Sequence, residues 1–224
     1  MKPILFFIFA NVFVLISCTR TVIIGDSLFW SGMLFGGGEP SPLSNWLETW
    51  SNHPIENYAK VGASVEPGWV KSIPDQYNSI NKNSPNNITT IIMDGGGNDV
   101  MSHRNDCEKW NEPCRQVLNK NIHEIEILFQ QFKDDGIQNV IYLGAYYLSG
   151  LEKAIDYGNS QLSLICNNAS IPCHFVDPRY NETNHHGLQT PEMLGSDGIH
   201  PNNDGYKILA EMIYDTAIEY HIIL

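Results

Sequence analysis

An alternation of short apolar runs with longer helical patterns constrains the fold of this chain more than any other feature. Three continuous runs rich in β-branched residues have the character of buried strands, at 21–24, 88–93 and 140–143, and 174–176 is a shorter candidate. Helical patterns follow at 114–133, 151–167 and 203–220. Strands that alternate with helices favour a largely parallel sheet with helices on both faces. The sequence therefore predicts an α/β fold, in which ligands bind at the carboxyl ends of the strands.

The stretch 114–133 has the clearest helical periodicity. Its apolar residues recur at spacings of four and three, which places them on one face of an amphipathic helix: Leu118, Ile122, Ile125, Phe129 and Phe132. The pattern stops at Asp135-Gly136, and glycine is a common residue just past the end of a helix. We expect one long helix here.

Composition narrows the classes of function. The 224 residues are 42% hydrophobic, which is enough for a real core and excludes a mainly disordered chain. The net charge is −12, from 13 basic and 25 acidic residues. Binding to nucleic-acid phosphates needs clustered Lys and Arg, so we expect no nucleic-acid partner.

The first 17 residues resemble an export signal. Lys2 precedes an apolar run, 4–16, that is too short to span a membrane but suits the core of a signal peptide. The run ends at Ser17-Cys18, which resembles a bacterial lipobox with Cys18 as the lipidated residue. An ordinary secretory signal and an uncleaved anchor are the alternatives. We expect export in some form, with 18–224 as a single domain.

Four further cysteines form two closely spaced pairs, Cys107 with Cys114 and Cys166 with Cys173. In an oxidising compartment each pair favours a local disulfide, and buried free thiols are the alternative. Neither pair has the C-x-x-C spacing of zinc or redox sites. No other ligand set is evident, so we expect neither a metal nor a cofactor.

Ser27 follows the first expected strand, in Gly25-Asp26-Ser27-Leu28. A serine at a strand-to-helix turn exposes its hydroxyl at the edge of the sheet, beside backbone N–H groups that favour an anion. The alternative is a helix N-cap by Asp26 or Ser27. Because a serine hydroxyl is a weak nucleophile without a base, a histidine is needed nearby.

His200 is the candidate base. It stands in Ser196-Asp197-Gly198-Ile199-His200, just before the last expected helix. A histidine that accepts the proton of a serine needs its other ring nitrogen held by a carboxylate. Asp197 is three residues away on a glycine-containing turn and is suited to that role, although a solvated surface turn is the alternative.

Two more segments offer hydrogen-bond donors. Asn98 follows the expected strand 88–93 in a glycine-rich segment, and its side-chain N–H groups can stabilise a developing oxyanion. Gly62 follows another candidate strand near Asn57, and its backbone N–H is a second donor. A glycine-rich turn capped by Asn98 is the alternative.

In this order, the four segments around Ser27, Gly62, Asn98 and His200 resemble the sequence blocks of the SGNH/GDSL hydrolase superfamily. The resemblance covers the chain from about Arg20 to its end. It implies a three-layer α/β/α, flavodoxin-like fold with a mainly parallel central sheet. It also implies a catalytic triad of Ser27, His200 and Asp197, and an oxyanion hole formed by Gly62, Asn98 and the Ser27 amide.

The expected function is that of an exported serine esterase acting on carboxylic esters. Small acyl or O-acetyl esters are slightly favoured, because a lipid on Cys18 would leave the site facing away from the membrane. The segment 28–35 is either a wall for the acyl chain or core packing. The alternatives are a lipase or lysophospholipase acting on longer chains, an acyltransferase to a sugar or lipid alcohol, and a non-catalytic binding module. The expected partner is a small-molecule, glycan or lipid ester.

Overall fold

The computed structural model describes residues 20–30, 42–80, 82, 87–180 and 187–224. The expected signal segment and Cys18 lie outside these residues, as do 31–35 of the segment that follows Ser27. No helix in the described ranges is long and apolar enough to cross a membrane.

Five strands and seven helices alternate along the described chain. The strands are β1 (Thr21–Ile24), β2 (Ile55–Asn57), β3 (Thr90–Met93), β4 (Asn139–Leu143) and β5 (Cys173–Val176). The helices are α1 (Pro42–Ser51), α2 (Ile73–Asn78), α3 (Gly97–Ser102), α4 (Arg104–Glu108), α5 (Glu112–Asp134), α6 (Glu152–Asn168) and α7 (Asn203–Glu219). All four runs expected to be strands are strands, and the three expected helices agree to within a few residues.

The strands form one parallel sheet in the order β2-β1-β3-β4-β5, which is the flavodoxin-like order. In the register of the central pair, Ile24 of β1 lies opposite Met93 of β3. The two segments that follow these strands therefore begin side by side at one edge of the sheet. This register brings the segment of Ser27 next to the segment of Asn98.

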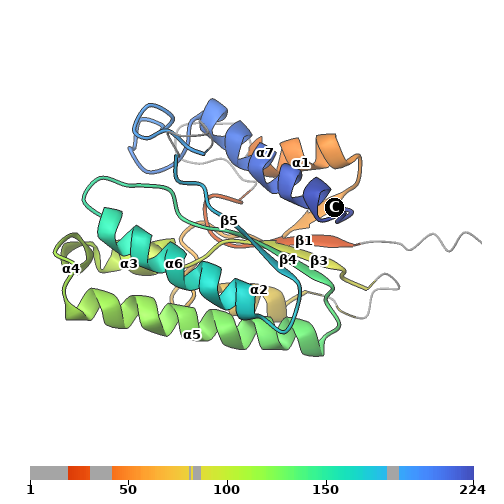
Figure 1. Ribbon diagram of the computed structural model, residues 1–224, viewed down its shortest axis with the longest axis horizontal. Coiled ribbons are helices and arrows are strands. Elements are labelled where there is room, and N and C mark those ends of the chain that lie inside the picture. The colour runs from red at the N-terminus through yellow and green to blue at the C-terminus, as the bar shows by residue number, and fades with distance from the viewer. Residues whose placement is uncertain (1–19, 31–41, 81, 83–86, 181–186) are drawn as a thin grey trace, which may run out of the picture.

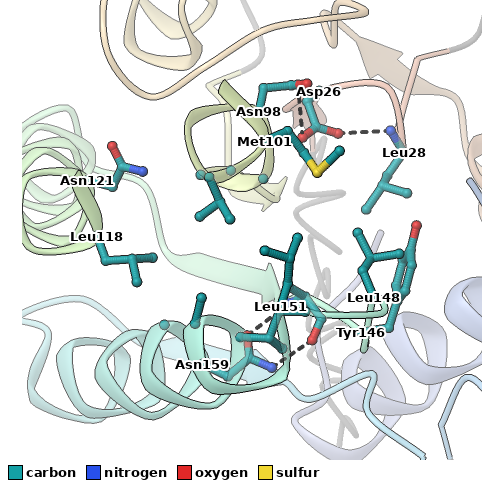
Figure 2. A pocket seen from close by; sticks show the side chains of 18 of the residues that line it. Asp26, Leu28, Asn98, Met101, Leu118, Asn121, Tyr146, Leu148, Leu151 and Asn159 are labelled. Atoms are coloured by element: carbon teal, nitrogen blue, oxygen red, sulfur yellow. Dashed lines mark hydrogen bonds between the residues drawn. The ribbon is translucent and has the colours of Figure 1, made fainter. Parts of the chain in front are cut away.

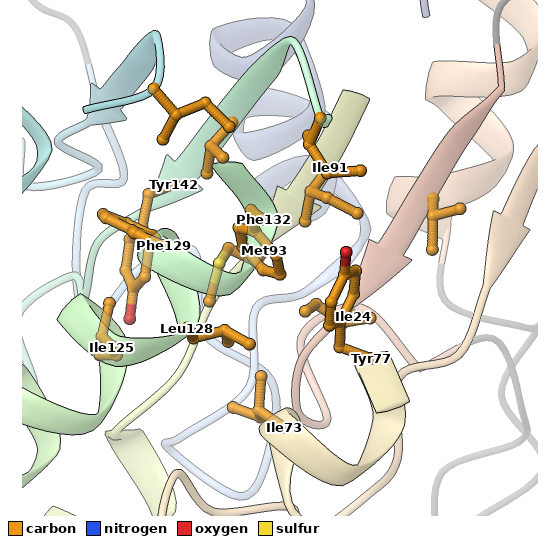
Figure 3. Packing of buried hydrophobic residues seen from close by; sticks show 14 of the residues in the cluster. Ile24, Ile73, Tyr77, Ile91, Met93, Ile125, Leu128, Phe129, Phe132 and Tyr142 are labelled. Atoms are coloured by element: carbon orange, nitrogen blue, oxygen red, sulfur yellow. The ribbon is translucent and has the colours of Figure 1, made fainter. Parts of the chain in front are cut away.

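Helices cover both faces of the sheet, with α2, α5 and α6 on one face and α1 and α7 on the other (Figure 1). Because side chains alternate along a strand, Ile91 and Met93 pack toward the first group of helices and Ile92 toward the second. Below the sheet, Tyr77 of α2 and Phe132 of α5 meet edge to face at 4.6 Å (Figure 3). The structure confirms the predicted three-layer α/β/α architecture.

The long helix α5 ends where the sequence indicated. Asn111 caps its start by accepting a hydrogen bond from the Cys114 N–H at 3.3 Å, so the helix begins at Glu112, slightly before the expected residue. At the other end, Gly136 takes the left-handed conformation with φ of 80°. This is the usual backbone arrangement just past a helix terminus.

Two local disulfides confirm the predicted cysteine pairs. Cys107–Cys114 joins α4 to α5, and Cys166–Cys173 joins the end of α6 to β5. Each bond closes a short loop between consecutive elements, so each limits the freedom of a connection in the unfolded chain. Such bonds are typical of oxidising compartments and are consistent with export.

Candidate active site

Ser27 lies in a turn directly after β1, at the carboxyl edge of the sheet. The backbone on both sides of it is held by carboxylates. The Asp26 N–H donates to Asp94 Oδ1 at 2.8 Å, and the Leu28 N–H donates to Asp26 Oδ1 at 3.0 Å. The alternative of a helix N-cap by Asp26 or Ser27 is not found among the described residues, where 27–29 form a turn and Asp26 Oδ1 accepts the Leu28 N–H.

A continuous hydrogen-bonded chain joins Ser27, His200 and Asp197. Ser27 Oγ is 2.8 Å from His200 Nε2, and His200 Nδ1 is 2.6 Å from Asp197 Oδ2. The other carboxylate oxygen, Asp197 Oδ1, accepts the backbone N–H groups of Ile199 and His200, both at 2.9 Å. Partial burial alone would raise the pKa of Asp197, but these hydrogen bonds outweigh it and lower the pKa below its usual range. The carboxylate therefore stays ionised beside the imidazole.

The loop that carries His200 is fixed at several points. Gly195 N–H donates to the His200 carbonyl at 2.7 Å, and Gly198 turns the chain with φ of 66°. Tyr146, from the segment after β4, donates its hydroxyl to the Ile199 carbonyl at 2.6 Å. The imidazole is therefore held against the edge of the sheet by a neighbouring strand as well as by its own loop.

Asn98 and Gly62 line the same pocket as Ser27 and His200. Asn98, in the first turn of α3, donates from Nδ2 to the Ala63 carbonyl at 2.8 Å and to Asp26 Oδ2 at 3.4 Å. The next residue, Asp99, accepts the Val65 N–H at 2.9 Å. Both contacts bind α3 to the turn that contains Gly62, where φ is 74°. Two segments from different strands thus converge on one place.

A pair of buried carboxyl groups lies behind this site, Asp26 and Asp94, at 6% and 3% exposure. Burial raises the pKa of both groups, and the charge of Asp26 raises the pKa of Asp94 further. Asp94 Oδ2 has no hydrogen-bond partner among the described residues. Sequence reasoning did not single out Asp94, although its place directly after an apolar strand was a usable signal.

One pocket brings the predicted residues together; Figure 2 shows Asn98 among the side chains that line it. Ser27, Gly62, Asn98 and His200 all line it, and Asp197 stands behind His200. Its volume is about 290 Å³. The arrangement supplies a hydroxyl, a base with an orienting carboxylate, and hydrogen-bond donors at one end of an otherwise apolar cavity.

Solved structures share this fold over nearly their whole length at low identity. A family 3 carbohydrate esterase from Clostridium thermocellum is 20% identical with a TM-score of 0.61, covering 90% of this chain and 96% of its own. A catalytic mutant of an acetylxylan esterase from Geobacillus stearothermophilus is 16% identical with a TM-score of 0.64, covering 89% and 94%. A lipase from a goat rumen metagenome is 17% identical with a TM-score of 0.64, covering 88% and 96%.

A search of curated proteins finds no match. The sequence model described as GDSL-like Lipase/Acylhydrolase matches residues 22–213, which is most of the chain and includes every residue of the site. The chain therefore belongs to the GDSL-like lipase/acylhydrolase family and is a carboxylic ester hydrolase.

Proposed function

We propose that this protein is an exported serine esterase that cleaves carboxylic esters through Ser27, His200 and Asp197. The observation that carries the proposal is the hydrogen-bonded chain from Ser27 Oγ through His200 to Asp197, at 2.8 and 2.6 Å. A serine nucleophile needs a hydrogen bond to its base, and the base needs a hydrogen bond to the group that orients it. The two contacts supply these bonds.

The first half of the reaction forms an acyl-enzyme. Ser27 Oγ attacks the ester carbonyl carbon while His200 Nε2 takes the hydroxyl proton. This requires the tautomer with the proton on Nδ1, which the ionised Asp197 favours by accepting that N–H. The same carboxylate stabilises the imidazolium that forms.

The negative charge that develops on the carbonyl oxygen needs donors that are already in place. We assign this role to Asn98 Nδ2 and to the backbone N–H groups of Gly62 and Ser27. The contact of Asn98 with the Ala63 carbonyl holds the amide in position before substrate arrives. A single donor of this kind contributes about 3 kcal/mol to stabilisation of the transition state.

The first half ends when the tetrahedral intermediate collapses: the original ester bond breaks, and the imidazolium of His200 gives its proton to the leaving alcohol. The second half returns the enzyme to its starting state. Water attacks the acyl-enzyme while His200 takes its proton, the bond between the acyl group and Ser27 Oγ then breaks, and His200 returns the proton to Ser27. If a sugar or lipid alcohol replaces water at this step, the protein is an acyltransferase, and product analysis with an added acceptor alcohol separates the two activities.

Export is supported by two disulfides and by the signal-like segment before Cys18. Lipidation of Cys18 and simple secretion remain two alternatives. The mass of the mature N-terminal peptide distinguishes them, because a lipidated Cys18 carries acyl chains and a secreted chain does not.

Hydrolysis of a series of p-nitrophenyl esters by the domain 18–224 tests the proposal, with Ser27→Ala and, as a matched control, Ser163→Ala on α6. We expect Ser27→Ala to remove turnover while its circular dichroism spectrum stays unchanged, and Ser163→Ala to keep it. Wild-type rates in Ser27→Ala would exclude Ser27 as the nucleophile. Absence of Ser27-dependent turnover on every ester would favour a non-catalytic binding module.

A further inference from the structure

The pocket continues well beyond the reacting groups. It runs from Ser27 and His200 into the space between α5 and α6, where apolar side chains of both helices line it. Those of α5 are Leu118, Ile122 and Ile125, and those of α6 are Ala154, Ile155 and Leu162. In Figure 2, Leu118 and Leu151 border the cavity at a distance from Asp26 and Leu28, which mark the end nearest Ser27. An acetyl group would leave most of this space unused.

The size of the pocket sets the size of a matching acyl group. A volume of about 290 Å³ corresponds to roughly ten groups of the size of a water molecule. A methylene group is of similar size, so the cavity holds an acyl chain of roughly eight carbons, the carbonyl carbon included, with the carbonyl oxygen and one further polar atom. The sequence slightly favoured small acyl groups, whereas the cavity favours the longer-chain alternative.

One polar side chain interrupts the apolar lining far from the nucleophile. Asn121 of α5 is 3% exposed, and neither Oδ1 nor Nδ2 has a hydrogen-bond partner among the described residues. Figure 2 shows it on the opposite side of the cavity from Leu28. A buried amide without partners costs free energy that a bound polar group recovers.

A second buried asparagine of the same pocket shows the contrast. Asn159 of α6 donates from Nδ2 to the Ala145 carbonyl at 2.7 Å, and its Oδ1 accepts the Ala145 N–H at 2.9 Å. These bonds give Asn159 a structural role in fixing the segment after β4. The amide of Asn121 makes no comparable contact. Both of its polar atoms are buried beside the cavity, so a ligand bonds them when the side chain turns toward that space.

We propose that this pocket binds an acyl group of about eight carbons that carries a neutral hydrogen-bonding group, such as a hydroxyl, at the end remote from the carbonyl. The proposal rests on the esterase function above. The body of the chain lies between α5 and α6, and Asn121 bonds its polar end. Both an ω-hydroxy aliphatic chain and a 4-hydroxycinnamoyl group have this chemistry, and the experiment includes both.

Gly158 gives a direct way to shorten the pocket. It lies on the face of α6 that lines the cavity, and a methyl group added there meets Leu118 Cδ2 at an ordinary 3.5 Å. Alanine and leucine also favour a helix more than glycine does. A leucine at Gly158 starts from a Cβ that meets no backbone atom of another element within 4 Å, and it extends the side chain beside the cavity. Gly158→Ala is a smaller step, and Ser160→Leu adds the same side chain on the exposed side of α6 as a control.

The first assay compares kcat/KM for p-nitrophenyl acetate, butyrate, octanoate and dodecanoate. Each buried methylene contributes at most about a fourfold gain, so we expect octanoate to exceed acetate about tenfold or more in the wild type and in Ser160→Leu. In Gly158→Leu we expect the ratio of kcat/KM for octanoate to that for acetate to fall toward one, and in Gly158→Ala we expect an intermediate ratio. A wild-type optimum at acetate, or an unchanged chain-length profile in Gly158→Leu, would overturn the proposal.

The second assay tests Asn121 by a ratio that general damage to the enzyme does not change. Octanoate is compared with 8-hydroxyoctanoate, and cinnamate with 4-hydroxycinnamate, in the wild type, in Asn121→Leu and in the exposed control Asn119→Leu. We expect the hydroxylated ester to lose about tenfold relative to its parent in Asn121→Leu in one of the two pairs. An unchanged ratio in both pairs would overturn the assignment.

The failure of this proposal differs visibly from failure of the esterase function. If Ser27-dependent hydrolysis occurs but peaks at acetate, the triad stands and the acyl pocket is wrong. If no ester gives Ser27-dependent hydrolysis, the esterase function itself fails, and the pocket proposal fails with it.

Discussion

Replacing Gly25 with alanine tests how the turn before Ser27 is built. Gly25 has a φ of 154°, a region that residues with a side chain rarely adopt. A Cβ atom there would lie 2.0 Å from Asp94 Oδ1, the atom that accepts the Asp26 N–H. Because no Cβ contact is that short, Asp94 must move by about 1 Å or more and release the backbone beside the nucleophile.

The expected loss of folding free energy in Gly25→Ala has two parts. The backbone conformation costs about 1–3 kcal/mol for a residue other than glycine. Loss of the buried hydrogen bond to the Asp26 N–H costs about another 1–3 kcal/mol. Gly136→Ala is the matched control, because Gly136 also has a positive φ, of 80°, but nothing lies within 4 Å of the added methyl group. We expect the free energy of unfolding of this control to fall by only about 1–2 kcal/mol.

Urea denaturation at neutral pH measures both variants, and ester hydrolysis is followed in parallel. The free energy of unfolding should fall about 2 kcal/mol more in Gly25→Ala than in Gly136→Ala. The kcat of Gly25→Ala should fall about 100-fold, because the nucleophile is displaced. A double-mutant cycle with Asp94→Ala isolates the clash, since the cost of Gly25→Ala should shrink when the carboxyl group is absent. Equal costs for Gly25→Ala in both backgrounds would refute this reasoning.

Three further changes test other parts of the molecule. His200→Ala should lower kcat about 1000-fold or more. Asp197→Asn should lower kcat by a factor that is about ten times smaller, because the orienting carboxylate does not itself transfer the proton. Comparison of the two kcat values checks this order. The raised pKa of Asp94 means that its protonated form stabilises the fold at low pH and that this contribution is lost as the pH rises from about 4 through the raised value. Between pH 4 and pH 8, the free energy of unfolding should therefore fall less in Asp94→Asn than in the wild type, as measured by urea titrations. Replacing Cys107 and Cys114 together with serine should reduce the free energy of unfolding by about 2–3 kcal/mol, and an unchanged denaturation midpoint would contradict a stabilising role for this bond.

The sequence predicts the sheet and the location of the site because both depend on local patterns. Continuous β-branched runs mark buried parallel strands, and in such a sheet the segments after neighbouring strands must meet at one edge. Ser27 and Asn98 follow β1 and β3, so their proximity follows from the topology alone. The disulfides are equally local, since each joins cysteines seven positions apart.

The acyl pocket illustrates what the pattern does not contain. Periodicity places Leu118 and Phe132 on one face of α5, but it does not reveal that Phe132 packs under the sheet against Tyr77 whereas Leu118 lines a cavity. That difference depends on how far α5 and α6 separate. The segment 28–35 was expected to be either acyl wall or core. Of its described residues, Leu28 lines the pocket and Phe29 is fully buried.

The burial of polar residues is a second feature that the sequence does not predict. Asn121 looks like an ordinary surface residue in the sequence, because polar side chains are mostly exposed, and only its place after an apolar strand distinguishes Asp94. Their burial is set by distant partners: Asp94 bonds the backbone at Asp26, and Asn121 stands against the glycine-rich segment at Gly96. Such contacts cannot be inferred from spacing along the chain.

Labelling with a fluorophosphonate, followed by intact mass and peptide mapping, tests the central claim most directly. The account predicts a single adduct on Ser27 that is absent from Ser27→Ala and forms much more slowly in His200→Ala. An adduct on another residue, or no adduct in the folded wild type, would contradict the assignment of Ser27 as the activated nucleophile.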